Sequence, residues 1–259
     1  MTRLVATDLD GTLLRSDRSI SARTLAALRA VEDAGIVVVF VTGRPLRWAR
    51  DVFEHVGGHG RAIVSNGAIV WNVADDRPEL LRQIDPATGL GVCELLRAAV
   101  PGTTYAVETL AGIALEPEFK ERYQVPAGSR RGSIEEIFDQ PAVKLLARHE
   151  ALCPQEFWDA AEEIVGDRVE ITWSSSTTLL EISAGGVTKA STLERLCADL
   201  GVAASEVIAF GDMPNDLPLL AWAGRSYAMA NAHETVRAAA DIITASNDED
   251  GVAAVLEGL

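Results

Sequence analysis

The chain has 259 residues, of which 48% are hydrophobic and 24% are charged. A chain of this length and composition can bury a sizeable core, either as one large domain or as two ordinary ones. Its formal net charge of −15 at pH 7 argues against nucleic-acid and anionic-membrane partners, because those surfaces select clustered lysine and arginine. Any anionic substrate would therefore need positive charge supplied locally, at its own binding site.

The cysteines and the N-terminal segment indicate the cellular compartment. Cys93, Cys153 and Cys197 lie far apart and form no CxxC pair, so neither a disulfide framework nor a zinc cluster is expected. The chain shows no basic leader followed by an apolar stretch, and no apolar run long enough to span a bilayer. We therefore expect a cytoplasmic protein with reduced thiols, and no feature of the sequence indicates an oligomeric state.

The first third of the chain alternates strands and helices. Serine is a favourable N-cap, glycine a common helix terminator, and an uninterrupted β-branched run is typical of a strand covered on both faces. The expected elements are a strand at Leu4–Thr7, a helix from Ser21 to Gly35, a strand at Ile36–Val41, a helix from about Pro45 to Val56 and a strand at Ala62–Val64.

The last third resumes this alternation, so both thirds are expected to contribute to one parallel sheet. The expected elements are a helix at Lys189–Leu200, a strand at Val207–Phe210, a helix near Leu217–Ala223, a strand at Tyr227–Ala230, a helix at Glu234–Ala240 and a strand at Asp241–Thr244.

The middle of the chain has a different residue pattern. Its predicted strands alternate polar and apolar residues, as is typical of antiparallel strands. We interpret residues 81–184 as an inserted α+β domain, and residues 1–80 and 185–259 as a discontinuous core. Asn66-Gly67 is a turn signal on the way out and Gly185-Gly186 a hinge on the return. The expected elements are helices at Ala87–Val100 and Pro154–Val165, and strands at Thr104–Glu108, Val143–Arg148, Val169–Trp173 and Thr178–Ile182.

Two aspartates follow the first predicted strand, in the segment Asp8-Leu9-Asp10-Gly11-Thr12. Alternation along an extended chain directs Asp8 and Asp10 the same way, Gly11 permits a sharp turn, and Thr12 can bond locally to hold it. Ligands of open α/β sheets bind at the carboxyl ends of the strands, so this acidic pair is well placed for catalysis. Taken alone, the segment is equally typical of a polar turn after a strand.

Three further polar segments lie directly after a predicted core strand or at the start of a predicted core helix. Thr42-Gly43-Arg44 follows the second strand, where a hydroxyl and free amides can bind a phosphoryl group. Lys189 begins a helix and could reach a phosphate as a point charge. The segment Gly211–Asp216 adds Asp212, Asn215 and Asp216 after another strand, and these acids would repel Asp8 and Asp10 unless a cation lay between them.

These four segments, in this order, resemble the haloacid dehalogenase superfamily, and within it the Cof-like phosphatases of subfamily IIB. The resemblance covers the whole core and implies a Rossmann-like parallel-sheet core of the α/β class with an inserted α+β cap of the C2 type. Ser65-Asn66-Gly67-Ala68 is similar to the segment that leads towards that cap. Met213-Pro214 departs from the pattern, because many relatives have a small residue there.

The resemblance also implies a role for each residue. Asp8 would attack phosphorus, and Asp10 would serve as general acid and base. Mg²⁺ would be bound by Asp8, Asp212 and the backbone carbonyl of Asp10, with Asp216 orienting a metal-bound water. Lys189 would be the third catalytic residue, because it would stabilise charge on the phosphoryl oxygens and shield Asp8 from its anionic target. Thr42, Gly43 and Asn215 would bind the phosphoryl group of the substrate. Arg44 is a further candidate for substrate binding, since its side chain could contact a second anionic group.

The function that the resemblance implies is Mg²⁺-dependent hydrolysis of a small phosphate ester, with a sugar phosphate as the expected substrate. Two alternatives stay open. The same scaffold could carry a phosphomutase or a disaccharide-phosphate phosphatase, which differ in the group that accepts the phosphoryl group. A non-catalytic phospho-acceptor or phosphosugar-binding protein would share the acidic site, but Asp10 argues against it because pure binding needs no general acid.

Overall fold

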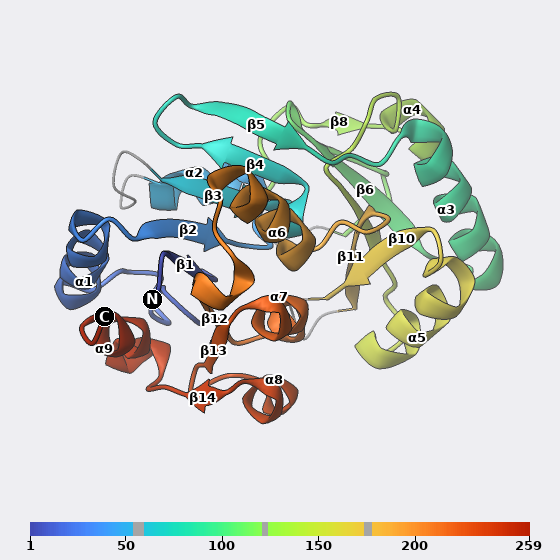
Figure 1. Cartoon of the computed structure of the whole chain (residues 1–259). Helices are drawn as coiled ribbons and strands as arrows, with labels where there is room; N and C mark the ends of the chain where they lie inside the picture. The colour runs from blue at the N-terminus through green and yellow to red at the C-terminus, as the bar shows by residue number, and fades with distance from the viewer. Residues whose placement is uncertain (54–59, 121–123, 174–177) are drawn as a thin grey trace. The chain divides into compact units, whose positions relative to one another are not determined.

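The structure is a computed structural model that describes residues 1–53, 60–120, 124–173 and 178–259 (Figure 1). The chain divides into two compact units. The first combines the two ends of the chain, Met1–Leu80 and Thr188–Leu259, and the second is the intervening Leu81–Val187. The second unit thus ends at Val187, after the Gly185-Gly186 pair, rather than at residue 184.

The first unit is built on an eight-stranded sheet with the order β14-β13-β12-β1-β2-β3-β4-β5. From β14 to β3 each neighbouring pair is parallel, and Leu4 of β1 lies between Val207 and Val37 in register. The strands are β1 Leu4–Thr7, β2 Val37–Val41, β3 Arg61–Val64, β4 Ile69–Asn72, β5 Arg77–Leu81, β12 Val207–Gly211, β13 Arg225–Ala228 and β14 Ile242–Ile243.

The sheet is not wholly parallel, which corrects the sequence-based expectation. A short 3₁₀ turn at Ser65–Gly67 reverses the chain after β3, and β4 pairs antiparallel with β3 from Val64↔Ile69 to Arg61↔Asn72. The turn signal at Asn66-Gly67 predicts an exit from the core at this point. The apolar Ile69–Trp71 run instead finds its burial on the core sheet, where all three side chains are buried.

Helices complete the first unit. Ser21 caps α1 as predicted, since its side chain accepts a hydrogen bond from the Thr24 amide at 3.0 Å. The expected end of the second helix near Val56 lies outside the described residues. Helix α9 has no counterpart among the predicted elements, and it packs against α1 while α6 packs against α7. The helices are α1 Ala22–Asp33, α2 Leu46–Phe53, α6 Lys189–Leu200, α7 Leu217–Trp222, α8 Glu234–Ala239 and α9 Gly251–Leu256.

The second unit has its own sheet, in the order β10-β11-β9-β6-β7-β8, and its own hydrophobic core. All its strand pairs are antiparallel except β7 with β8. The elements are α3 Pro86–Ala99, β6 Thr104–Thr109, β7 Gly112–Leu115, β8 Arg130–Arg131, α4 Ile134–Ile137, β9 Lys144–Arg148, α5 Pro154–Val165, β10 Val169–Thr172 and β11 Leu179–Ala184.

Two expectations about the chain as a whole can be compared with the structure. The three cysteines are free, and Cys93 and Cys197 are buried. In the part of the chain that the structure describes, no helix has both the length and the apolar character needed to cross a membrane.

Candidate active site

Four neighbouring parallel strands, β12, β1, β2 and β3, place polar segments at one edge of the sheet (Figure 1). The residue directly after each strand is Asp212, Asp8, Thr42 and Ser65, respectively. Because the strands are parallel, their carboxyl ends meet at the same edge. The sheet topology therefore brings together segments that lie up to 200 residues apart in sequence.

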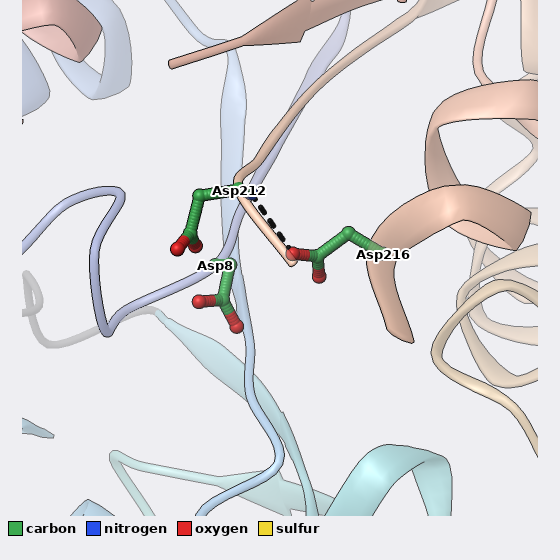
Figure 2. A group of neighbouring side chains, drawn as sticks. All are labelled: Asp8, Asp212 and Asp216. Carbon is green, nitrogen blue, oxygen red and sulfur yellow. Dashed lines mark hydrogen bonds between the residues drawn. The ribbon is translucent and has the colours of Figure 1, made fainter. Parts of the chain in front are cut away.

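Three carboxylates form the centre of this site. Asp8, Asp212 and Asp216 are buried, and each offers a carboxylate oxygen within 4.8 Å of the other two (Figure 2). The 3₁₀ turn Pro214–Asp216 brings Asp216 back over the end of β12. There its Oδ2 accepts hydrogen bonds from the amides of Asp212 at 3.0 Å and Met213 at 3.1 Å.

Lys189 is the cation of the group. It is the first residue of α6, which Thr188 caps by accepting a hydrogen bond from the Ser191 amide. Its Nζ donates to Asp8 Oδ1 at 2.7 Å and to Asp216 Oδ1 at 2.6 Å, and only 2% of the side chain is exposed. Lys189 therefore bridges two of the three carboxylates.

Burial and mutual repulsion dominate the electrostatics of this group. Burial raises the pKa of Asp8 well above its ordinary value, and Asp216 and Asp212 raise it further against the opposing effect of Lys189. Burial, then the charge of Asp216, raises the pKa of Asp212 to about 7. Burial alone would lower the pKa of Lys189, but the negative charges of Asp216 and Asp8 outweigh it and raise that pKa. One lysine thus faces more negative charge than it can neutralise.

The donor set suits a hard divalent cation. The three clustered groups offer carboxylate oxygens, the ligand type that Mg²⁺ prefers, and the raised pKa of Asp212 indicates negative charge that a cation would stabilise. Asp216 already accepts from Lys189 and from two backbone amides. Asp8 and Asp212 accept fewer such bonds, from Lys189 and Thr12 respectively, so the role of Asp216 in orienting a metal-bound water stays a prediction.

Asp10 is separate from the three buried carboxylates. Its side chain is 55% exposed, and Arg44 donates to both of its oxygens, from Nε at 2.6 Å and from Nη2 at 2.5 Å. The metal ligand predicted at Asp10 is its backbone carbonyl and not this side chain. Arg44, which is predicted to bind substrate, forms a forked ion pair with the predicted general acid in this structure.

The residues predicted to bind a phosphoryl group lie next to one another. Thr42 is buried and its Oγ1 accepts from the Arg44 amide at 3.0 Å. A Cβ added to Gly43 would lie 2.8 Å from Asn66 Oδ1 and 3.6 Å from Asn215 Nδ2. The Asn215 amide donates to Asn66 Oδ1 at 3.3 Å. Thr42, Gly43 and Asn215 are thus gathered at the ends of β2 and β12.

Two residues of the site, Thr12 and Asn66, are not among the site residues predicted from the sequence. Thr12 was expected to bond locally, but its Oγ1 donates to Asp212 Oδ1 at 2.8 Å, across 200 positions of the chain. Asn66 is predicted only as part of a turn and of the segment that resembles the approach to the cap. It is the second residue after β3, so its place just beyond a parallel strand is a signal that could have found it.

Comparisons with known proteins agree with this geometry. A family model described as a haloacid dehalogenase-like hydrolase matches residues 5–256. The chain is 32% identical over 252 residues to 5-amino-6-(5-phospho-D-ribitylamino)uracil phosphatase YcsE of Bacillus subtilis, covering 97% of this chain and 93% of the relative. It is 30% identical over 268 residues to the B. subtilis phosphatase YitU of the same description, covering 98% and 96%.

A solved structure extends the comparison to the whole fold. The crystal structure of a haloacid dehalogenase-like hydrolase from Bacteroides thetaiotaomicron aligns with a TM-score of 0.81 at 27% identity, covering 100% of this chain and 99% of that one. The chain therefore belongs to the haloacid dehalogenase-like hydrolases, which confirms the family resemblance carried by its motifs.

Proposed function

We propose that this chain, a phosphatase of the haloacid dehalogenase-like family, hydrolyses a small phosphorylated metabolite, with a sugar phosphate as the preferred substrate. In the proposed reaction the phosphoryl group is held covalently on Asp8 between the two steps. The observation that carries the proposal is the buried group of Asp8, Asp212 and Asp216 around Lys189. The concentrated negative charge would repel a dianionic ester, and a bound divalent cation would offset that repulsion.

Asp8 is the nucleophile in this reaction. Its carboxylate oxygen attacks phosphorus in line, the bond between phosphorus and the ester oxygen breaks, and the electron pair leaves with that oxygen. Lys189, bonded to Asp8 Oδ1, orients the carboxylate and reduces its repulsion of the incoming phosphate. Bound Mg²⁺, held by Asp8, Asp212 and the Asp10 carbonyl, would supply electrophilic stabilisation of the phosphoryl oxygens.

Asp10 is the general acid and base of the reaction. It donates a proton to the leaving oxygen in the first step. In the second step it takes a proton from the water that attacks phosphorus, while the bond between phosphorus and the Asp8 oxygen breaks and the Asp8 carboxylate is restored. Its exposed position gives it access to solvent, and Arg44 orients it through both oxygens. Thr42, the Gly43 amide and Asn215 bind the transferring group as hydrogen-bond donors.

The second unit, Leu81–Val187, is proposed as the cap that selects the substrate. It has its own sheet and core, so it can diverge without disturbing the carboxylate group of the first unit. Sugar phosphates are favoured as substrates on the basis of the family resemblance, since the relatives named above act on a phosphoribityl compound.

The experiment measures phosphate release from para-nitrophenyl phosphate and a panel of sugar and nucleotide phosphates, in Mg²⁺ or in EDTA. Wild type should release phosphate only with Mg²⁺. Asp8→Asn should abolish turnover with an unchanged melting temperature, because the amide is isosteric but far less nucleophilic. Asp167→Asn is the matched control, since the Asp167 side chain is 82% exposed and lies in the second unit.

The other outcomes separate the alternatives. Near-wild-type activity of Asp8→Asn would remove Asp8 from its role. Transfer to a sugar hydroxyl rather than to water would identify a phosphomutase. Stable phosphorylation of Asp8 without turnover would identify a phospho-acceptor.

A further inference from the structure

The turn after β3, Ser65-Asn66-Gly67, has no role in the mechanism above. All three residues have positive φ, at 52° for Ser65, 55° for Asn66 and 105° for Gly67. Residues with a side chain rarely adopt this conformation, and they persist in it only where their surroundings fix them. The contacts of the turn therefore indicate what it is held against.

The turn is bonded to the loop that follows β2. The Ser65 amide donates to the Arg44 carbonyl at 2.9 Å, and the Asn66 amide donates to the Thr42 carbonyl at 3.1 Å. These two hydrogen bonds fix the backbone on either side of Gly43. The turn thus sets the position of the proposed phosphate-binding loop.

The same turn contacts the helix that carries Lys189. The Gly67 carbonyl accepts from Thr192 Oγ1 of α6 at 2.8 Å. A Cβ on Gly67 would lie 2.3 Å from the Thr188 carbonyl oxygen, so the backbones approach closely there. The turn therefore lies between two of the elements that would hold the phosphoryl group.

The side chain of Asn66 points to a more specific role. It is 2% exposed, its Oδ1 accepts from Asn215 Nδ2, and the same oxygen is the nearest atom to a Cβ built on Gly43. An amide oxygen can only accept, so this contact requires Asn215 to present its NH₂ group beside Gly43. One hydrogen of that group bonds to Asn66, which leaves the second for an anion.

We propose that Asn66 is a positioning residue of the phosphate site, acting through Asn215. Its carboxamide oxygen fixes the orientation of the Asn215 amide, so that the Asn215 NH₂ group and the Gly43 amide converge on one phosphoryl group. This inference rests on the proposed function, since it names a further residue that organises the same site.

Two substitutions separate this role from a backbone role. Asn66→Gly removes the carboxamide but adopts positive φ freely, whereas Asn66→Ala removes the carboxamide and strains the backbone. Asn72→Ala is the matched control, because the Asn72 amide bonds to Asp75 and Glu79 in the neighbouring hairpin. Each variant is tested for inhibition by inorganic phosphate, for kcat and KM with para-nitrophenyl phosphate, and for melting temperature.

The expected result is that both Asn66 variants bind inorganic phosphate about tenfold more weakly, as expected for loss of one positioning hydrogen bond to a charged ligand site. Asn66→Gly should keep its melting temperature while its kcat/KM falls by a similar factor. In an Asn215→Ala background the effect of Asn66→Gly should shrink below about twofold, because the two residues act as one unit.

Three results would overturn the inference. Wild-type phosphate affinity and kcat/KM in Asn66→Gly, with loss only in Asn66→Ala, would show that the position needs positive φ alone. Equal losses in Asn72→Ala would show a general effect of the hairpin. Full additivity with Asn215→Ala would show that Asn66 does not act through Asn215.

Failure of the proposed function is distinguishable from these results. A wild type that releases no phosphate from any ester in Mg²⁺ would overturn the proposed function. Calorimetric binding of inorganic phosphate with Mg²⁺ needs no turnover and would still compare wild type with Asn66→Gly. A tenfold difference would support the positioning role, and equal affinity or no binding would overturn it.

Discussion

Residues of one type have different chemistry here because their surroundings differ. Asp8 is buried and bonded to Lys189, whereas Asp10 is exposed and paired with Arg44. Asp216 is fully buried and accepts from one ammonium group and two backbone amides. Of these three side chains, only that of Asp10 is largely exposed to solvent, as its proposed role in proton transfer permits.

Asp10→Asn should lower kcat by about 10²- to 10⁴-fold, the usual contribution of a general acid and base. The amide keeps an oxygen for Arg44, so the melting temperature should stay within a few degrees of wild type. Single-turnover kinetics should show both formation and hydrolysis of the phosphorylated enzyme to be slowed. A normal rate in either step would remove Asp10 from that step.

Thr12→Val should weaken Mg²⁺ activation. The valine is close in size but cannot donate to Asp212 Oδ1, so that carboxylate loses the bond that orients it. Loss of one hydrogen bond to a charged group predicts roughly a tenfold higher Mg²⁺ concentration for half-maximal activity. Thr24→Val, whose buried hydroxyl contacts Ser21 and Asp250, is the control and should leave the Mg²⁺ titration unchanged.

At the scale of elements, the turn after β1 must pass close to the loop after β12. Gly11 has φ of 74°, and a Cβ there would lie 2.3 Å from Asp212 Oδ2. Glycine at this position therefore satisfies both a backbone and a steric requirement. The sequence alone indicates only the backbone requirement.

Gly11→Ala and Gly35→Ala form a matched pair. Gly35 has φ of 83° and no heavy atom within 4 Å of an added Cβ. Both variants should lose about 1–2 kcal/mol of unfolding free energy from left-handed strain. Only Gly11→Ala should also lose activity and Mg²⁺ response, since its Cβ displaces Asp212. Chemical denaturation and phosphate release measure the two effects, and an active Gly11→Ala enzyme would contradict the argument.

At the scale of the whole molecule, the first unit is assembled from the two ends of the chain. Strand β1 pairs with β12, whose residues lie about 200 positions later, and the second unit is inserted between them. The site is therefore complete only when the last third of the chain has joined the sheet. The negative charge of the buried site carboxylates must then be balanced by cations or protons within the folded first unit.

Mg²⁺ should stabilise the protein, and the gain should depend on pH. The folded-state pKa of Asp212 is about 7, above its ordinary value of 3.8, so the metal-free folded protein holds a proton that the unfolded chain releases. In EDTA the contribution of Asp212 to stability is full below about pH 4 and is lost as pH rises through 7.

Thermal melts with Mg²⁺ or EDTA from pH 5 to 8 test this expectation. Binding at 100 times Kd adds about 2.7 kcal/mol, or a shift on the order of 5 °C, and the gain should be largest above pH 7. Asp212→Asn should lose most of the Mg²⁺ shift. An unchanged shift in that variant would place the metal elsewhere.

The sequence by itself determined most of the strands and helices and the acids after the strand ends, because these depend on local periodicity and on caps such as Ser21. It did not predict β4, β5 or α9. It also determined which segments share the site edge, since parallel strands present their carboxyl ends together. Asp8, Asp212, Asp216 and Lys189 could therefore be assigned to one site before any coordinates.

Only the tertiary structure decided which side chains bond to one another. The pairing of Arg44 with Asp10, the bond from Thr12 to Asp212 and the contact between Asn66 and Asn215 join segments that meet through strand order. The β4–β5 extension of the core sheet is of the same kind, because a turn signal marks a reversal but not the partner to which the chain returns. Periodicity fixes which face of an element is buried, while contacts between distant elements depend on packing of the whole unit.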